Sequence, residues 1–314
     1  MISIIIPCYN VSEYIGQALE SILTQQFILN TDYEIICVDD CSTDSTMEIL
    51  QLYSNKGVKI VTVDKNRGVS HARNIGLIHA KGEYVWFFDA DDLASPNSLQ
   101  QISNVIKNNH VEAIRFYASF VGEESANDKI VYLEDLPTNN NLYCFVFKRN
   151  FINDKKLFFC EEMTYSEDVA FICMCFVNKI TIYDISEALY YYRQRSTSLI
   201  HRKDENKYFQ SILKLPFYYE SFMNLSFEST VKHNLTMLIY DAVQSCVMHA
   251  VRKDRKTLRE TLQLLCSAGL YPYPIRWNLL NKSQKFRVII NKSIFLFAPI
   301  QSYLYFLNHL IGKK

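Results

Sequence analysis

The first 116 residues alternate short runs of β-branched and aromatic residues with segments of helical periodicity, and this alternation restricts the chain to few folds. Apolar residues recur at helical spacing between the runs, as in Ile15, Ala18, Leu19 and Ile22. Because the runs are almost continuously apolar, we expect a parallel sheet covered by helices on both faces. Ligands of such sheets bind outside the carboxyl ends of the strands. Strands are expected over residues 3–6, 34–38, 59–63, 84–88 and 111–116.

Two helix starts are indicated by capping patterns. Ser45 and Glu48 have the spacing of a capping box ahead of a helix. Ser95 followed by Pro96 places an N-cap before a proline at the first helical position. We therefore expect helices to begin at these two points.

Composition sets the size and class of the protein. The 314 residues are 49% hydrophobic, which excludes a disordered chain and fits one large domain or two smaller ones. Thirty-three basic residues balance thirty-three acidic ones, so the formal net charge of +0 argues against binding nucleic acid. Beyond the charged run 201–205 helical patterns replace strand patterns, and we place a domain boundary near residue 202.

Cysteine usage and hydropathy indicate the compartment. None of the nine cysteines forms a C-x-x-C pair, and Cys37, Cys173 and Cys175 lie in apolar runs typical of small buried residues. A reducing, cytoplasmic environment is expected. No segment reaches the roughly 18 uninterrupted apolar residues of a membrane span. We therefore do not expect an integral membrane protein.

Acidic residues follow two of the expected strands. Asp39 and Asp40 end one run, and Asp89, Asp91 and Asp92 follow another. Carboxylates brought to one sheet edge repel one another unless a cation is present, and Mg²⁺ or Mn²⁺ would resolve the repulsion. The alternative is an acidic turn that caps the next helix. Calcium loops of the EF-hand type are excluded, because Ala94 and Ser45 occupy the required glycine positions, and glycine-rich phosphate loops are absent.

Four segments together resemble the family 2 glycosyltransferases of the GT-A fold. They are residues 3–10 (SIIIPCYN), 38–44 (VDDCSTD), 66–76 (NRGVSHARNIG) and 82–92 (GEYVWFFDADD). The resemblance covers about residues 1–200. It implies a Rossmann-like, mostly parallel sheet between helices in a catalytic domain over residues 1–202, with a nucleotide-sugar part over about 1–116 and an acceptor part over about 117–202. Residues 203–314 are expected to form a helical C-terminal region.

The resemblance implies a site for a nucleoside diphosphate sugar, most often a UDP-sugar, with Mn²⁺ or Mg²⁺ as cofactor. Pro7 and Tyr9 would bracket the base, and Asp40 would accept a hydrogen bond from the uracil imide. Asp89 would face the ribose or the metal, and Asp91 would ligate the metal. Cys41 departs from the family, which usually has glycine there. The remaining expected donor-site residues are Asn10, Glu13, Arg73 and Ala90.

The resemblance also implies a general base downstream. Glu167-Asp168 matches the family's Glu-Asp motif, and Asp168 would deprotonate the acceptor hydroxyl. The alternative is that residues 166–168 only begin a helix, as an N-cap and first-turn acids. Arg193 or Arg195 would either fold over the diphosphate or belong to a solvated basic loop. The histidines at positions 71, 79 and 201 are interpreted as structural.

The implied reaction is inverting transfer of a sugar to a saccharide or lipid-linked acceptor in cell-surface polysaccharide synthesis. Two alternatives are a nucleotidyltransferase, disfavoured by a first loop without glycine or charge over residues 7–12, and an inactive scaffold protein, disfavoured by the intact acidic residues. The amphipathic tail over residues 294–311 fits either peripheral contact with the inner face of the membrane or packing on the catalytic domain or a second copy. The sequence leaves the oligomeric state open.

Overall fold

The computed structural model describes residues 1–27, 30–122 and 141–194, together with Ser211, Glu260 and Gln263. Contacts divide the chain into two compact units, Met1–Lys203 and Asp204–Lys314. All strands and helices given below belong to the first unit. Arg195, the loop 123–140 and the helical patterns beyond residue 203, including 294–311, lie outside the described residues. That residues 1–116 bind the nucleotide sugar and residues 117–202 bind the acceptor stays a prediction.

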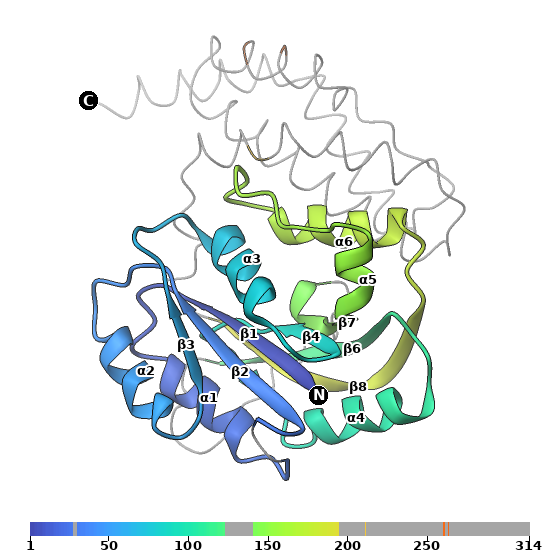
Figure 1. The fold of residues 1–314 in the computed structure, drawn as a ribbon, viewed down its shortest axis with the longest axis horizontal. Coiled ribbons are helices and arrows are strands. Elements are labelled where there is room, and N and C mark those ends of the chain that lie inside the picture. Colours follow the sequence, from blue (N-terminus) through green and yellow to red (C-terminus); the bar gives the residue numbers. More distant parts are fainter. Residues whose placement is uncertain (28–29, 123–140, 195–210, 212–259, 261–262, 264–314) are drawn as a thin grey trace, which may run out of the picture. The chain divides into compact units, whose positions relative to one another are not determined.

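One eight-stranded sheet organises the first unit (Figure 1). Its strands are β1 (Ile2–Cys8), β2 (Tyr33–Asp39), β3 (Lys59–Thr62), β4 (Tyr84–Phe87), β5 (Leu93–Ala94), β6 (Ala113–Val121), β7 (Phe145–Lys148) and β8 (Ile182–Arg193). They are ordered β3-β2-β1-β4-β7-β6-β8-β5. Four of the seven neighbouring pairs are parallel, and the pairs made by β7 and β5 are antiparallel. The sheet is therefore parallel where β3, β2, β1 and β4 adjoin and mixed beyond β4.

The central strands are buried along their whole length, as their apolar sequences predict. Every residue of β2 and β4 is buried, and β1 is buried except for the half-exposed Pro7. β1 pairs with β2 at one edge and β4 at the other, and because its successive residues are buried, helices must cover both of its faces. The strands expected before residue 90 are confirmed to within two residues. The fifth expected strand is shifted, since β6 starts at Ala113 and runs to Val121.

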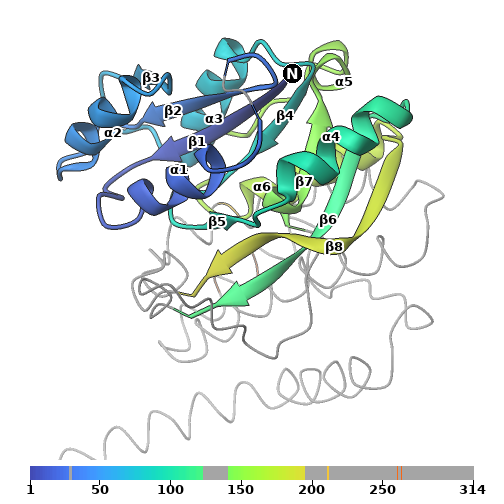
Figure 2. The ribbon, with the colours of Figure 1, turned by 90° about the horizontal axis from the view of Figure 1, so that it is seen from below.

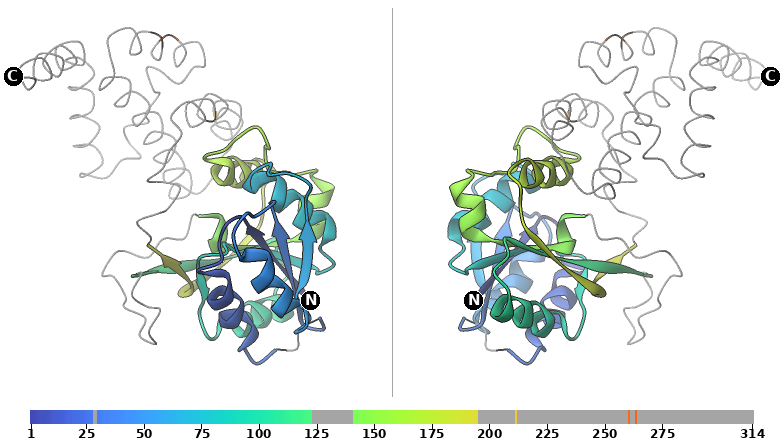
Figure 3. Two further views of the ribbon diagram at one scale, coloured as in Figure 1. Left: turned by 90° about the vertical axis from the view of Figure 1, so that its left-hand side faces the viewer. Right: turned by 90° about the vertical axis from the view of Figure 1, so that its right-hand side faces the viewer.

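Two layers of helices enclose the sheet. α1 (Ile15–Leu23), α2 (Thr46–Ser54) and α4 (Ser98–Asn108) lie on one face (Figures 1 and 2). α3 (Val69–His79), α5 (Arg149–Asp154) and α6 (Glu167–Val177) lie on the other face. Figure 3 shows α4 on one side of the long strands β6 and β8 and α5 with α6 on the opposite side. A short 3-10 helix, η2 (Leu142–Cys144), precedes β7.

The predicted capping box before α2 is wrong. Ser45 occupies the N-cap position but its side chain makes no capping hydrogen bond. Asp44 supplies the cap instead, because its Oδ1 accepts the Thr46 N–H at 3.0 Å and its Oδ2 accepts the Ser12 N–H at 3.1 Å. The carboxylate one residue earlier thus both caps α2 and ties it to the loop that follows β1.

The start of α4 also differs from the prediction. The helix begins at Ser98 with Asn97 as N-cap, so Ser95 and Pro96 precede it. Ser95 is tied elsewhere, since its N–H donates to the Leu189 carbonyl at 3.0 Å and its own carbonyl accepts the Ser98 N–H at 3.1 Å. These bonds fix Ser95 to β8 and leave a turn between it and the helix.

Two glycines place α3 against the sheet. Gly68 precedes α3 with φ of 92°, a left-handed conformation that favours glycine. A β-carbon on Gly76 would lie 2.2 Å from Cγ2 of Ile5 in β1, so only glycine allows α3 to approach this closely. Because α3 follows the carboxyl end of β3, its first turns lie at the edge where ligands are expected.

The cysteines and hydropathy of the described residues follow the sequence patterns. Cys37, Cys173 and Cys175 are buried as expected, whereas Cys41 is exposed in the loop after β2. Within the described residues, every helix is too short or too polar to span a bilayer.

Candidate active site

The carboxyl ends of β1, β2 and β4 lie together because these strands are neighbours in the sheet. Cys8 of β1 pairs with Asp39 of β2, and Phe87 ends β4 beside Ile5. The segments that follow these strands carry most of the expected donor-site residues. Their shared edge is therefore the candidate active site.

The loop after β1 presents an exposed tyrosine. Tyr9 is 46% exposed, and the preceding Pro7 is half-buried. Asn10 adopts a φ of 52°, and its side-chain Oδ1 accepts the Thr43 N–H at 2.8 Å while its own N–H donates to Ser42 Oγ at 3.1 Å. Asn10 thus fixes this loop against the loop after β2 and leaves the Tyr9 ring available to a planar ligand.

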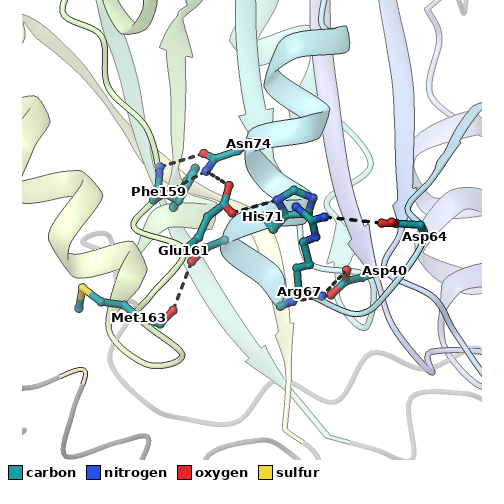
Figure 4. A network of polar contacts seen from close by, with 10 residues as sticks. Asp40, Asp64, Arg67, His71, Asn74, Phe159, Glu161 and Met163 are labelled. Carbon is teal, nitrogen blue, oxygen red and sulfur yellow. Dashed lines mark hydrogen bonds and ion pairs between the residues drawn. The ribbon is translucent and has the colours of Figure 1, made fainter.

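Asp40 is buried and organises the start of α3. Its Oδ1 accepts the Arg67 N–H at 3.0 Å, and its Oδ2 accepts the Gly68 N–H at 2.7 Å. A carboxylate has about four acceptor positions, so two backbone bonds leave capacity for a ligand donor. Figure 4 shows Asp40 beside the backbone of Arg67, whose guanidinium points to Asp64.

Arg73 joins two parts of the site that are far apart in sequence. Its Nη2 lies 3.0 Å from Asp89 Oδ1, and its Nη1 lies 2.8 Å from Glu167 Oε1. The Arg73 side chain is only 7% exposed, and its guanidinium also stands over the Phe159 ring at 5.4 Å. One guanidinium therefore connects the turn after β4 with the first turn of α6.

Burial and charge raise the pKa values of the acids at α6. Burial, reinforced by the charge of Asp168, raises the pKa of Glu167 to about 7, although Arg73 opposes the rise. Burial also raises the pKa of Asp168, again against the effect of Arg73. The carboxylates around Arg73 raise its pKa, so the guanidinium stays charged. The pKa values of these two carboxyl groups therefore lie closer to neutral pH than those of ordinary carboxyl groups.

Asp168 lies at the start of α6, half-buried. Its Oδ1 accepts the Val169 N–H at 2.8 Å. Ser166 occupies the N-cap position with a φ of 59° and makes no side-chain capping bond, so the ordinary capping role is not filled by this serine. Because this bond engages only Oδ1, the carboxylate of Asp168 retains acceptor capacity.

The turn Asp89–Asp92 separates its carboxylates. Asp92 points inward, where its Oδ2 accepts the Tyr190 hydroxyl at 2.6 Å and its Oδ1 accepts the Arg193 N–H at 2.8 Å. The same Tyr190 hydroxyl accepts the Asp89 N–H at 3.2 Å. Burial and the neighbouring aspartates raise the pKa of Asp92 well above its usual value. Asp89 and Asp91 remain half-buried, and Ala90 between them is buried.

These residues fit a Mg²⁺ or Mn²⁺ ion of the kind held together with a phosphate ligand. Within the described ranges, no three histidine, cysteine or acidic side chains form a protein-only metal site. Such ions need only one or two carboxylates when substrate phosphates complete the shell. Asp91 and the second oxygen of Asp89 provide that number, because Arg73 engages only Oδ1 of Asp89.

Two other predicted residues border this group: Glu13 follows β1, and the backbone N–H of Arg193 donates to Asp92. Glu13 is exposed in the loop before α1. Arg193 is buried at the end of β8, with its guanidinium 5.3 Å from the centre of the Tyr14 ring. A role of Arg193 as a solvated basic loop residue is therefore wrong, because the side chain is packed inside the fold.

Sequence reasoning missed the polar and aromatic groups that support the site. The Tyr190 hydroxyl accepts a backbone N–H of the turn after β4, and its ring stacks on Tyr143 at 4.5 Å between ring centres. His71 was expected to be structural, and it lies 3.1 Å from Glu161 by its Nδ1. Asn74 contacts the segment before α6. The signal for such a supporting role is the burial of polar side chains on a helix, and burial is known only from the fold.

Comparison with known proteins identifies what the chain is similar to. A family model described as "Glycosyl transferase family 2" matches residues 3–169. The poly(ribitol-phosphate) beta-N-acetylglucosaminyltransferase TarS of Staphylococcus aureus is 30% identical over 207 residues, which cover 60% of this chain and 35% of that protein. The chain thus spans about a third of the length of this relative.

Solved structures show the same fold. A crystal structure of S. aureus TarS 1–349 in complex with UDP-GlcNAc matches with a TM-score of 0.70 at 20% identity, over 99% of this chain and 92% of that one. A mannosyltransferase from Pyrobaculum calidifontis, solved with GDP-Man and Mn²⁺, matches with a TM-score of 0.55 at 17% identity, over 100% of this chain and 88% of that one. The expected α/β GT-A fold is confirmed.

Proposed function

The chain belongs to glycosyl transferase family 2, and from this premise we propose that it transfers a sugar from a UDP-sugar to a hydroxyl of a polymeric acceptor, with inversion at the anomeric carbon. The observation that carries the proposal is the position of Arg73. It brings Asp89, on the expected donor side, into one cluster with Glu167, next to the expected base Asp168. A UDP-sugar bound on the Asp89 side of this cluster and an acceptor hydroxyl bound on the Asp168 side would therefore lie next to each other.

The first two loops supply the proposed nucleotide site. The exposed Tyr9 ring offers a stacking surface for a base, with Pro7 beside it. Asp40, fixed by two backbone N–H groups, is proposed to accept the imide N–H of uracil. The UDP-GlcNAc complex of TarS, whose fold this chain shares, supports a uridine nucleotide. Asn10, Glu13 and Ala90 belong to the proposed site as neighbours of these groups.

Asp91 and Asp89 are the residues that would hold a divalent cation. Bound there with the diphosphate, Mg²⁺ or Mn²⁺ would supply electrostatic stabilisation of the charge that develops on the leaving group. The Mn²⁺ complex of the mannosyltransferase supports a metal of this kind. Arg73 keeps Asp89 oriented, and Tyr190 fixes the backbone N–H of the same residue.

Asp168 is the proposed general base. It would accept the proton of the acceptor hydroxyl as that oxygen attacks the anomeric carbon from the side opposite the diphosphate. A base works best when its pKa approaches the working pH, and burial moves the pKa of Asp168 in that direction. Arg73 limits the rise, so the carboxylate stays available to take the proton. A single displacement of this kind inverts the configuration of the sugar.

The acceptor is proposed to be a poly(ribitol phosphate) or related cell-surface polysaccharide, because TarS is named for a poly(ribitol phosphate) substrate. We place the reaction in the cytoplasm, at or near the inner face of the membrane. These assignments depend on relatives of which the chain covers only part, and direct transfer to the polymer tests them.

Calorimetric titration of UDP into the purified chain, with and without Mn²⁺, tests the donor site. Metal-dependent binding in the micromolar range supports the proposal, and Asp91→Asn should abolish the dependence on Mn²⁺. Absence of binding by UDP and every UDP-sugar, with or without metal, would refute it and favour an inactive scaffold protein. Binding of a nucleoside triphosphate in preference to UDP would favour a nucleotidyltransferase.

A further inference from the structure

The first two turns of α3 present a row of buried polar side chains to one segment of the chain. Ser70 Oγ donates to the Met163 carbonyl at 3.4 Å, and Arg73 bonds Glu167 at 2.8 Å. His71 and Asn74 contact the residues between these two points. Four side chains of one helix therefore bind the nine-residue segment 159–167, which ends immediately before Asp168.

Asn74 makes the most complete of these contacts. Its Oδ1 accepts the Phe159 N–H at 2.9 Å, and its Nδ2 donates to the Phe159 carbonyl at 3.0 Å. The same Nδ2 donates to Glu161 Oε1 at 3.1 Å. Both backbone groups of Phe159 are thereby paired with one buried amide, which fixes the position and direction of the chain at this residue. Figure 4 shows Asn74 facing Phe159 and Glu161.

Glu161 attaches the segment 159–167 to α3 at a second point. Its Oε2 lies 3.1 Å from His71 Nδ1, while its Oε1 accepts from Asn74. Figure 4 places Glu161 between His71 and Asn74. Because both carboxylate oxygens face α3, the segment is held at a side chain as well as at the backbone of Phe159.

The Phe159 ring transmits this placement to α6. It stacks on Phe171 at 4.2 Å between ring centres with 7° between planes. It also meets Phe87, the last residue of β4, edge-to-face at 4.9 Å. Phe171 is three residues after Asp168, which is about one helical turn. A chain of direct contacts therefore runs from Asn74 through Phe159 and Phe171 to the turn that carries Asp168.

We propose that Asn74 is a positioning residue for sugar transfer: by clamping Phe159 it sets where the first turn of α6, and with it Asp168, stands relative to the donor. The inference rests on the proposed function of Asp168 as base. Within the part of the chain that the structure describes, the Asn74 side chain bonds Phe159 and Glu161, and neither the expected donor-site loops nor Asp168. It should therefore govern turnover rather than donor affinity.

Two substitutions test the proposal in the full-length chain. Asn74→Ala removes all three bonds, and the nearly isosteric Asn74→Asp keeps the acceptor for the Phe159 N–H but faces Glu161 and the Phe159 carbonyl with a charge. We expect each to lower kcat for transfer from UDP-GlcNAc to poly(ribitol phosphate) by about 10- to 100-fold, the effect of a shift of roughly 1 Å in a reacting group. The Kd for UDP with Mn²⁺ should stay within about twofold of wild type, the agreement expected of unperturbed binding.

Asn178→Ala is the matched control. The Asn178 Nδ2 also donates to a backbone carbonyl, that of Met174, at 2.8 Å, but at the opposite end of α6. Its removal costs a comparable side-chain hydrogen bond without touching segment 159–167. The control should retain wild-type kcat, and thermal unfolding should confirm that all three variants are folded at the assay temperature.

Hydrogen exchange separates this inference from the proposed function. In both Asn74 variants the amides of residues 157–168 should lose protection, while those of residues 84–92 keep it. A wild-type chain that transfers no sugar from any UDP-sugar contradicts the proposed function, whereas the exchange pattern still tests the clamp. A folded Asn74 variant with wild-type kcat, a parallel loss of UDP affinity, or failure of both variants to fold would overturn the positioning role.

Discussion

Replacing Arg73 by methionine should expose the electrostatic balance on which the site depends. The side chain lies 7% exposed between Asp89 and Glu167, at 3.0 and 2.8 Å from their oxygens. Methionine preserves much of the volume but removes the guanidinium. The carboxyl groups of Asp89, Glu167 and the adjacent Asp168 would then share a mostly buried region without a counter-charge.

Breaking a buried ion pair by removing one partner typically costs about 3–5 kcal/mol of unfolding free energy, and we expect Arg73→Met to fall in this range at pH 8. The cost should shrink at low pH. Burial has already raised the pKa of Glu167 to about 7 with Arg73 present, and loss of the guanidinium would raise it further. An acid with a raised pKa in the folded state destabilises the fold as pH rises through that value. At pH 5 Glu167 is protonated in both proteins, so the charge that Arg73 neutralises is smaller.

Urea unfolding at pH 5 and pH 8 measures the difference. Trp86 is fully buried in β4, and a Trp277→Phe background makes it the only tryptophan of the chain. The destabilisation by Arg73→Met should be larger at pH 8 than at pH 5 by up to about 1.4 kcal/mol, the equivalent of the one unit between pH 8 and the Glu167 pKa of about 7. Arg115→Met is the control, because its partner Asp184 is half-exposed and can return to water. Destabilisation below about 1 kcal/mol at pH 8, the range of exposed ion pairs, or equal values at both pH values, would refute the reasoning.

Three further changes test separate parts of the account. Asp168→Asn should keep UDP affinity and lower kcat by about 10²–10⁴-fold, because the base is lost and the donor site is not; single-turnover rates would show it, and an unchanged rate would place the base elsewhere. Gly76→Ala should cost about 1–3 kcal/mol in urea unfolding because the new methyl group meets a buried isoleucine at 2.2 Å, while Gly16→Ala, with its nearest atom at 3.6 Å, should cost nothing; equal effects would contradict the close packing of α3. Tyr190→Phe should destabilise by about 1–3 kcal/mol because Oδ2 of the buried Asp92 loses its hydroxyl donor, and thermal unfolding that matches wild type would contradict this bond.

The parallel half of the sheet was predictable because each of its strands can be identified from its own local sequence. Ile4, Ile35 and Val85 belong to short apolar runs bounded by turn residues, and burial on both faces leaves no other place for such runs. The position of β7 was not predictable in the same way. Val146 lies in a similar apolar run, but its antiparallel pairing with Trp86 of β4 depends on a long-range contact that no local pattern contains.

Helix caps were mispredicted where long-range contacts outweighed local spacing, although α2 itself starts where expected, at Thr46. Ser45 has the spacing of a capping residue, yet the Asp44 carboxylate caps α2 because it also binds the Ser12 N–H in the loop after β1. Ser95 was expected to cap α4, yet the helix begins three residues later, and Gln25 Oε1 accepts the Leu99 N–H at 2.9 Å. In both cases a side chain that also binds another segment, Asp44 or Gln25, accepts a helix N–H in place of the predicted serine.

The acidic edge of the site was predicted from strand ends, but the use of each acid was not. The sequence assigned no role to Asp92, and only the fold shows that it turns inward to Tyr190, about a hundred residues later in the chain. The bridge from Arg73 to Glu167 spans a similar separation. Residue type and spacing therefore predicted where charge gathers, and long-range pairing decided which of these charges support the fold.

Anomeric configuration is the most direct measurement of the central claim. Wild type and Asp168→Asn would be incubated with a UDP-sugar, Mn²⁺ and poly(ribitol phosphate), and the anomeric proton of the transferred sugar would be read by NMR. The account predicts a β-linked product from an α-linked donor with the wild-type chain and, with the variant, a rate lower by about 10²–10⁴-fold. An α-linked product, or equal rates from the two proteins, would contradict inverting transfer with Asp168 as base.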